Sequence, residues 1–200
     1  MSKPRLRGVL HKWGFFVSLL AGVLLIATAH GDRAVLGAVI FAAAVSALLG
    51  TSALYHRIEW QTAARRWMRR LDHSMIFVLI AASYTPFALL ALHGVLATVV
   101  LCVAWAGALG GVVLQLVWAD HPKWASSLIA ACLGWVAVGG VILSGALYTT
   151  GAIVYARERP NPVPGVFGYH ELFHAFVLAA AAIQYGVIAF VVLPIAPGAR

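Results

Sequence analysis

Long apolar stretches alternate with short polar ones along the whole chain. The polar separators are "GDR", "RIEWQTAARRWMRRLD", "HG", "ADHPK" and "RERPNPVPG". The apolar stretches cover approximately 13–30, 34–56, 73–92, 95–118, 124–156 and 169–193. They lack the period-2 alternation of barrel strands, and lipid offers no water to unpaired backbone groups, so helices are predicted. We therefore expect an all-α fold, a polytopic transmembrane helical bundle.

The stretch 124–156 has a length that fits neither one span nor two full ones. Two spans would have only about 15 or 16 residues each, fewer than the ~20 that cross a hydrocarbon core of about 30 Å, yet one span needs no more than about 25. Gly139-Gly140 is the natural place for a tight reversal. If the chain does reverse there, it forms seven helices, of which the fifth and sixth are short.

The positions of the basic residues favour this double crossing. With seven helices, twelve of the fourteen lysines and arginines lie on one side of the membrane, and only Arg33 and Arg200 lie on the other. The positive-inside rule then places the N-terminus in the cytoplasm and the C-terminus outside. We expect one integral domain over 1–200 in the cell membrane, with three main cytoplasmic parts: the N-terminus at 1–12, a basic loop at 57–71 and a loop at 157–168.

Composition agrees with a membrane protein and explains the excess of positive charge. Hydrophobic residues make up 62% of the chain and charged residues 10%, values outside the range of soluble domains. The net charge of +8 comes from short clusters between apolar stretches, which is typical of cytoplasmic loops. The expected partner is therefore the lipid bilayer and not nucleic acid. Cys102 and Cys132 lie in different apolar stretches without nearby histidines, which predicts packing rather than a disulfide or a metal clip.

Ionisable side chains gather at the predicted cytoplasmic helix ends. His170 and His174 are four residues apart, so one helix face presents both imidazoles, about 6 Å from each other. His56 ends the second predicted helix, Ser52 precedes it by one turn, and Asp72 begins the third. Three neutral imidazoles leave a fourth tetrahedral position for water, as in catalytic zinc sites. We predict that the three histidines bind Zn²⁺, that Asp72 binds or orients the water, and that Ser52 donates a hydrogen bond beside it.

Several of these residues also fit simpler roles. Asp72 alone could be the N-cap or first-turn acid of its helix, and Glu171 fits either an interface acid or a partner of the ligands. His73 follows Asp72 directly and is turned about 100° away from that helix face. The remaining histidines are expected to be interfacial residues: His11, His30, His93 and His121.

The chain resembles the hemolysin III proteins, within the wider progestin and adipoQ receptor superfamily. The resemblance rests on "SALYHRI", "RRLDHSMIFVLIAASYTPFALL", "GWVAV" and "GALYTTGAIVYARERPNPVPGVFGYHELFHAF" and covers nearly the whole chain. It implies seven helices, a cytoplasmic N-terminus, and zinc held by three histidines with an aspartate beside its water. The motif positions correspond to His56, Ser52, Asp72, His170 and His174. One departure is the short "GGVILS" between the last two motifs, where relatives have a longer stretch, so the packing of the fifth and sixth helices is in question.

Three functions remain open from the sequence. The superfamily is similar to alkaline ceramidases, which hydrolyse a lipid amide at such a zinc site, so the first is a zinc-dependent hydrolase of a lipid amide or ester. The second is a membrane-active, pore-forming protein, as the hemolysin name implies, although few polar residues line the spans. The third is a regulator of membrane state with a structural zinc. The HExxH spacing of "HELFH" also matches zinc proteases, but His56 already supplies the third ligand. The substrate and the oligomeric state are left open.

Overall fold

The computed structural model describes residues 4–118, 122, 124, 127, 128, 130 and 142–195. Within these residues the regular structure is helical, and Val163 and Phe167 form an isolated bridge. The helices are α1 (Val9–Ala27), α2 (Asp32–Arg57), α3 (Thr62–Leu90), α4 (Gly94–Val117), α6 (Ile142–Arg157) and α7 (Tyr169–Val187). A π-helical segment, Ile188–Val192, and a short 3-10 segment, Leu193–Ile195, continue α7.

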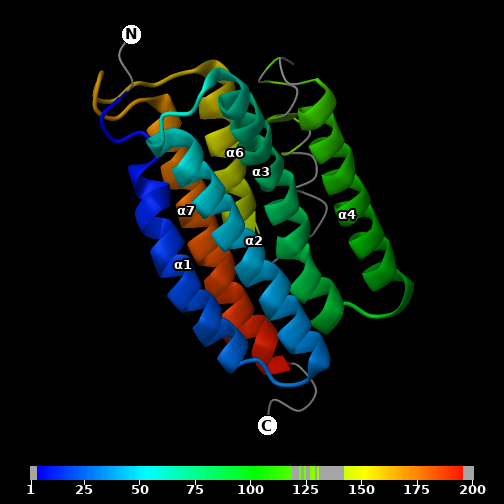
Figure 1. Ribbon diagram of the computed structural model, residues 1–200. Helices are drawn as coiled ribbons and strands as arrows, with labels where there is room; N and C mark the ends of the chain where they lie inside the picture. Colours follow the sequence, from blue (N-terminus) through cyan, green and yellow to red (C-terminus); the bar gives the residue numbers. More distant parts are fainter. Residues whose placement is uncertain are drawn as a thin grey trace.

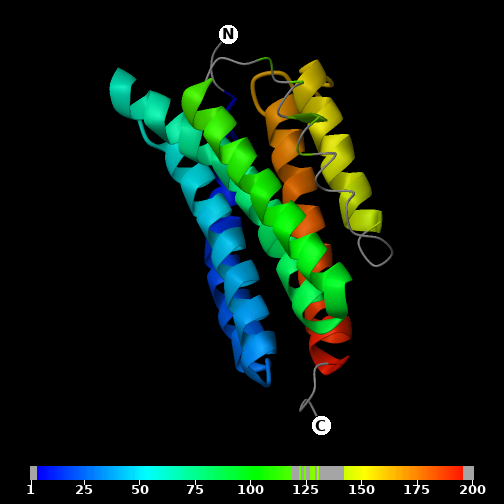
Figure 2. The same ribbon diagram turned by 90° about the vertical axis from the view of Figure 1, so that its right-hand side faces the viewer.

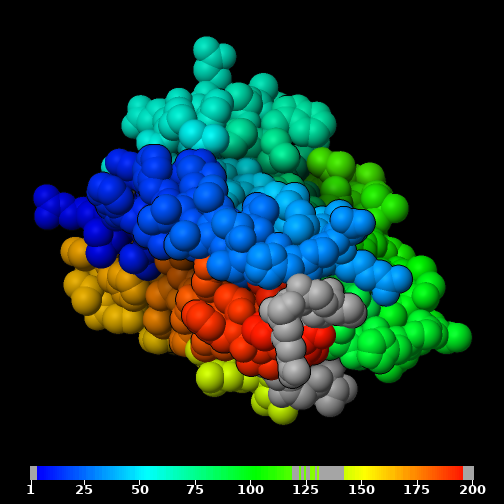
Figure 3. Space-filling view, turned by 90° about the horizontal axis from the view of Figure 1, so that it is seen from below, coloured from blue at the N-terminus to red at the C-terminus, as the bar shows by residue number. Residues whose placement is uncertain are grey.

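The helices form one bundle in which α1, α2, α3 and α4 alternate in direction, α6 runs in the same direction as α4, and α7 runs opposite to α6 (Figure 1). α2 packs between α1 and α3, α4 packs on α3, and α6 packs on α7. Seen from the lower end, α1 and α2 lie along one side of α7 and α6 lies on the other (Figure 3). The starts of α1, α3 and α7 therefore lie at the same end of the bundle as the ends of α2, α4 and α6. This upper end in Figure 1 is where the candidate site lies.

Five of the helical segments are long and apolar enough to cross a membrane: α1, α2, α3, α4 and the continuous Tyr169–Ile195. Large apolar side chains on the outer faces of α1 and α4 are exposed, among them Leu20 and Leu109, as expected for contact with lipid. α6 has only 16 residues. It begins about halfway along the bundle and runs to the upper end, where α4 also ends (Figure 2). The predicted fifth helix and the Gly139-Gly140 reversal lie outside the described residues.

Small residues allow the helices to approach closely. A Cβ atom placed on Gly22 of α1 would lie 2.9 Å from the Cβ of Ala42 on α2, and one on Gly111 of α4 would overlap the ring of Phe77 on α3. Both contacts would be closer than a normal carbon contact. Apolar burial supplies little force between helices that already lie in lipid, so close contact of small residues is an important source of packing energy in membranes.

The predicted basic loop at 57–71 is mostly helical, and that prediction needs correction. α2 extends to Arg57 and α3 starts at Thr62, so only 58–61 lies between them. The first turns of α3 project beyond the neighbouring helices (Figure 2). The sequence "TAARRWMRR" has no apolar stripe, but alanine, arginine and methionine are good helix formers. Helix propensity and continuity with the buried part of α3 explain why the segment is helical.

Candidate functional site

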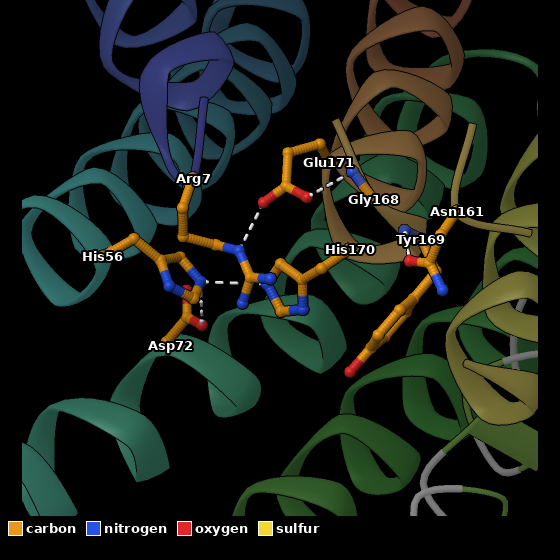
Figure 4. Close-up of polar contacts among 8 residues, drawn as sticks. All are labelled: Arg7, His56, Asp72, Asn161, Gly168, Tyr169, His170 and Glu171. Atoms are coloured by element: carbon orange, nitrogen blue, oxygen red, sulfur yellow. Dashed lines mark hydrogen bonds and ion pairs between the residues drawn. The ribbon is translucent and has the colours of Figure 1, made fainter. Parts of the chain in front are cut away.

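Three histidines meet at the upper end of the bundle. His56 lies in the last turn of α2, and His170 and His174 lie in the first two turns of α7. All three are buried, and their ligand nitrogens lie within 4.8 Å of one another. The Nε2 atoms of His56 and His170 are 3.0 Å apart (Figure 4). Helix spacing alone predicted that His170 and His174 share a face of α7. The packing of the helices brings His56 of α2 next to them.

Asp72 and Ser52 lie beside this cluster. Asp72 lies on α3. Its Oδ2 atom is 3.7 Å from Nε2 of His56, and Figure 4 shows the carboxylate directed toward the imidazole. The Ser52 hydroxyl donates a hydrogen bond to the Asp72 carboxylate. Asp72 is more than one helical turn past the first residue of α3, Thr62, so it is not an N-cap. The structure thus brings together all five of the predicted site residues.

The donor set fits a zinc ion. Two imidazole nitrogens bound to one zinc at about 2.1 Å in tetrahedral geometry are roughly 3.4 Å apart. The His56 to His170 distance of 3.0 Å is close to this value, and the 4.8 Å limit for the set requires only small side-chain movements. Neutral imidazoles suit zinc and other divalent transition metals, whereas magnesium and calcium prefer oxygen.

Glu171 is buried, but its partner is not one of the histidines. Its side chain is completely inaccessible to solvent and forms an ion pair with Nε of Arg7. Its second carboxylate oxygen accepts a hydrogen bond of 2.9 Å from the backbone N–H of Gly168, which caps the start of α7 (Figure 4). The backbone N–H groups of Arg5 and Leu6 also donate to the carbonyls of 165 and 166. The N-terminal segment is therefore tied to the start of α7, directly beside the cluster.

One histidine was wrongly expected to be interfacial. His11 is only 2% exposed, and its ring stacks on that of His174, with centroids 3.7 Å apart and planes 11° from parallel. A signal for this was present in the sequence, because His11 shares a helix face with the buried Ser18, Gly22 and Leu25 of α1. Three other histidines were also expected to be interfacial. His30 and His93 are exposed, which agrees with that expectation, and His121 lies outside the described residues.

A cavity of about 90 Å³ extends from the cluster into the bundle. His170, His174, Asp72, Ser52 and His11 form its polar end. Apolar side chains of α2, α3 and α7 form a large part of the rest of its wall: Leu48, Ile76, Phe77, Leu79, Ile80, Phe173 and Val177. α6 contributes Gly145, Tyr148, Thr149, Ala152 and Tyr155, and His73 and Gln115 add further polar groups. The arrangement gives a group with an apolar tail a place beside the three imidazoles.

Comparison with known proteins identifies the family. The model of the family described as "Haemolysin-III related" matches residues 1–142 and 137–185. The chain belongs to this family. It is 30% identical to a hemolysin-3 from Bacillus cereus over 94% of this chain and 91% of the relative, and 29% identical to a hemolysin-3 homolog from Bacillus subtilis (strain 168) over 91% of each. It is also 37% identical to an adiponectin receptor protein from Drosophila melanogaster, over 38% of this chain and 17% of the relative.

Family membership confirms the resemblance drawn from the sequence motifs, and together with the five apolar helices it indicates a multi-pass membrane protein. It also fits the three-histidine cluster, which could hold a metal ion. The identity of that ion and the roles of Asp72 and Ser52 stay predictions.

Proposed function

We propose that this haemolysin-III family protein is a zinc-dependent hydrolase that cleaves an amide or ester bond of a membrane lipid, in the manner of alkaline ceramidases. The observation that carries the proposal is the position of three buried imidazoles and a carboxylate at the polar end of an apolar cavity. A purely structural zinc site has four protein ligands, whereas a catalytic one has three and an open position. The described residues supply three histidines and leave space beside them.

Each residue of the site has a defined task. His56, His170 and His174 would hold the metal. When bound, zinc supplies Lewis acidity, which lowers the pKa of water and polarises a carbonyl group. Asp72 would accept the proton of the attacking water and return it to the leaving amine or alcohol. Ser52 donates to the Asp72 carboxylate and so fixes its orientation.

The surroundings support a lipid rather than a water-soluble substrate. The cavity wall next to the histidines is largely apolar, which suits an acyl chain. The cluster lies at the ends of helices whose outer faces bear exposed leucine, valine and phenylalanine side chains. A scissile carbonyl near the lipid headgroup would be at the same depth as the cluster, with its chain in the cavity.

The proposal includes the topology predicted from the sequence: seven spans in the cell membrane, an N-terminus in the cytoplasm, and a single domain. Support comes from α4 and α6, which both run toward the upper end of the bundle (Figure 2). Two successive described helices with the same direction fit one further span between them. The site would then lie at the cytoplasmic face, beside the basic segments.

Substitution of Asp72 tests the proposal. Protein purified in detergent should contain about one zinc per chain, and His56→Ala, His170→Ala or His174→Ala should each lower the zinc content strongly, whereas His93→Ala should not. Asp72→Asn removes the proton acceptor but no imidazole, so zinc should remain while turnover of ceramide or another acyl lipid falls by about 10²–10⁴-fold. Asp32→Asn, which alters an exposed carboxylate in the first turn of α2, is the matched control.

Full turnover in Asp72→Asn would contradict the proposed role of the carboxylate. Zinc retention in all three histidine variants would contradict the metal site.

A membrane-permeabilising activity is the competing function, because two relatives carry the name hemolysin-3. It predicts release of dye from liposomes of ether-linked, non-hydrolysable lipid, with the same rate for wild type and Asp72→Asn. Dye release that is also insensitive to chelators and occurs without any lipid product would favour this function over hydrolysis.

A further inference from the structure

His11 is a buried imidazole beside the candidate metal ligands. It is 2% exposed, and within the described part of the chain neither Nδ1 nor Nε2 makes a hydrogen bond of normal geometry; the backbone of His174 is a polar group close to the ring. Its ring lies flat against that of His174. Leaving a buried polar group unpaired costs about as much as losing a hydrogen bond, so such a group in a native protein needs an explanation.

Stacking alone does not explain a histidine at this position. A phenylalanine would fill the same space against His174 without burying two unpaired nitrogens. The next buried positions on this face of α1 are small or apolar: Ser18, Gly22 and Leu25. Ser18 is the polar one among them, and its hydroxyl group already forms hydrogen bonds with Ser46 and the carbonyl of Phe15. A bound ligand therefore explains the presence of these two nitrogens better than packing does.

A role as a fourth metal ligand is also disfavoured. The nitrogens that lie within 4.8 Å of one another belong to His56, His170 and His174, and His11 is not part of this set. A ring that is stacked nearly parallel to His174 is offset from the plane in which His174 would bind a metal. His11 does line the cavity together with Ser52, Asp72 and His174. Its nitrogens are thus available to a molecule in the cavity.

We propose that His11 is a further binding residue of this site: it forms a hydrogen bond with a polar atom of the ligand that occupies the metal centre. For a lipid amide or ester, this atom would be the amide N–H, the ester oxygen or a hydroxyl near the scissile bond. The inference rests on the metal site of the proposed function, but it does not require that the bound molecule be hydrolysed. Stacking on His174 holds the His11 ring in place for this contact.

Binding of a hydroxamate to the cobalt-substituted protein tests this inference without any turnover. Octanohydroxamic acid has two oxygens that bind a metal ion, an N–H group for a further hydrogen bond, and an alkyl chain for the cavity. Its affinity is measured from the change in the visible absorption of Co²⁺, and the metal content is measured on the same samples. The variants are His11→Phe, which keeps a stacked ring, His11→Asn, which keeps polar atoms, and His93→Phe as the control at an exposed histidine.

We expect His11→Phe to retain one Co²⁺ per chain with an unchanged spectrum and to bind the hydroxamate about 3- to 10-fold more weakly, the scale of one lost hydrogen bond. His11→Asn should recover part of the affinity, and His93→Phe should match wild type. If His11→Phe does not fold, His11→Leu replaces it, because leucine also lacks polar atoms.

Wild-type hydroxamate affinity in a metal-loaded His11→Phe protein would overturn the inference, since it would show that only the ring is needed. Loss of the metal from folded His11→Phe would also overturn it, because His11 would then belong to the metal shell. Absence of Co²⁺ binding in the wild type would refute the proposed metal site itself. Absence of lipid turnover, with the difference in hydroxamate affinity intact, would refute only the hydrolase.

Discussion

Arg7 and Glu171 form one ion pair, but substitution of Arg7 should lower the stability of the protein more than substitution of Glu171. The Glu171 side chain is fully buried, whereas that of Arg7 is 19% exposed. Arg7→Met leaves a carboxylate inside the protein with one remaining hydrogen bond, from Gly168. Glu171→Gln keeps an acceptor for that N–H and leaves a guanidinium that can turn toward water. The first variant should therefore be the less stable of the two.

The magnitude follows from the burial of the two partners. Breaking a buried ion pair costs about 3–5 kcal/mol when the remaining charge is uncompensated. Because Arg7 already contacts solvent, we place the loss for Arg7→Met near the lower limit, at about 2–3 kcal/mol, and the loss for Glu171→Gln at about 1 kcal/mol. For a protein of this size, the first loss corresponds to a fall in the melting temperature of roughly 5–10 °C.

Unfolding in detergent micelles, followed by circular dichroism, provides the measurement. The double variant Arg7→Met/Glu171→Gln should be more stable than Arg7→Met alone, because no charge is then left buried. Equal losses for the two single variants, or losses that simply add in the double variant, would show that the pair does not behave as a buried ion pair.

Two further predictions concern topology and packing. A reporter fused after Asn161 should be cytoplasmic and one at Arg200 should be outside, as the distribution of basic residues requires; the same location for both would refute seven spans. Gly111→Ala should destabilise the protein by about 1–2 kcal/mol, since its methyl group would overlap the Phe77 ring. Gly110→Ala, whose Cβ meets nothing within 4 Å, should be neutral or stabilising in the same unfolding assay, and equal effects would contradict the close contact seen at Gly111.

Much of the helix pattern and the main cluster could be predicted from the sequence. Hydropathy located the apolar parts of the helices because lipid exposure requires long apolar runs. His170 and His174 share a face through local helix geometry alone. His56 and Asp72 could be added because helix ends on one side of a membrane lie at a similar depth. Side chains at these ends are therefore the candidates for contact with the histidine pair. The prediction failed for 57–71, where helix propensity acts without an apolar pattern.

His11 and Arg7 show where this approach stops. The partners of both lie in the first turns of α7, about 160 residues later in the sequence, and no local pattern in α1 or before it indicates which distant helix it contacts. The small residues on its face of α1 could have indicated that His11 packs against protein. Only the packing of α1 against α7 identifies His174 as its partner.

The separation of the ligands along the chain affects how the protein is made. His56 and His170 are 114 residues apart, and α7 leaves the ribosome after α1 to α4 and α6. A partly synthesised chain with α1 to α4 already in the membrane would hold a single imidazole of the three and could not retain zinc by that residue alone. Metal would therefore be acquired only after synthesis of α7, and a product that ends before His174 would be inserted in the membrane yet remain inert.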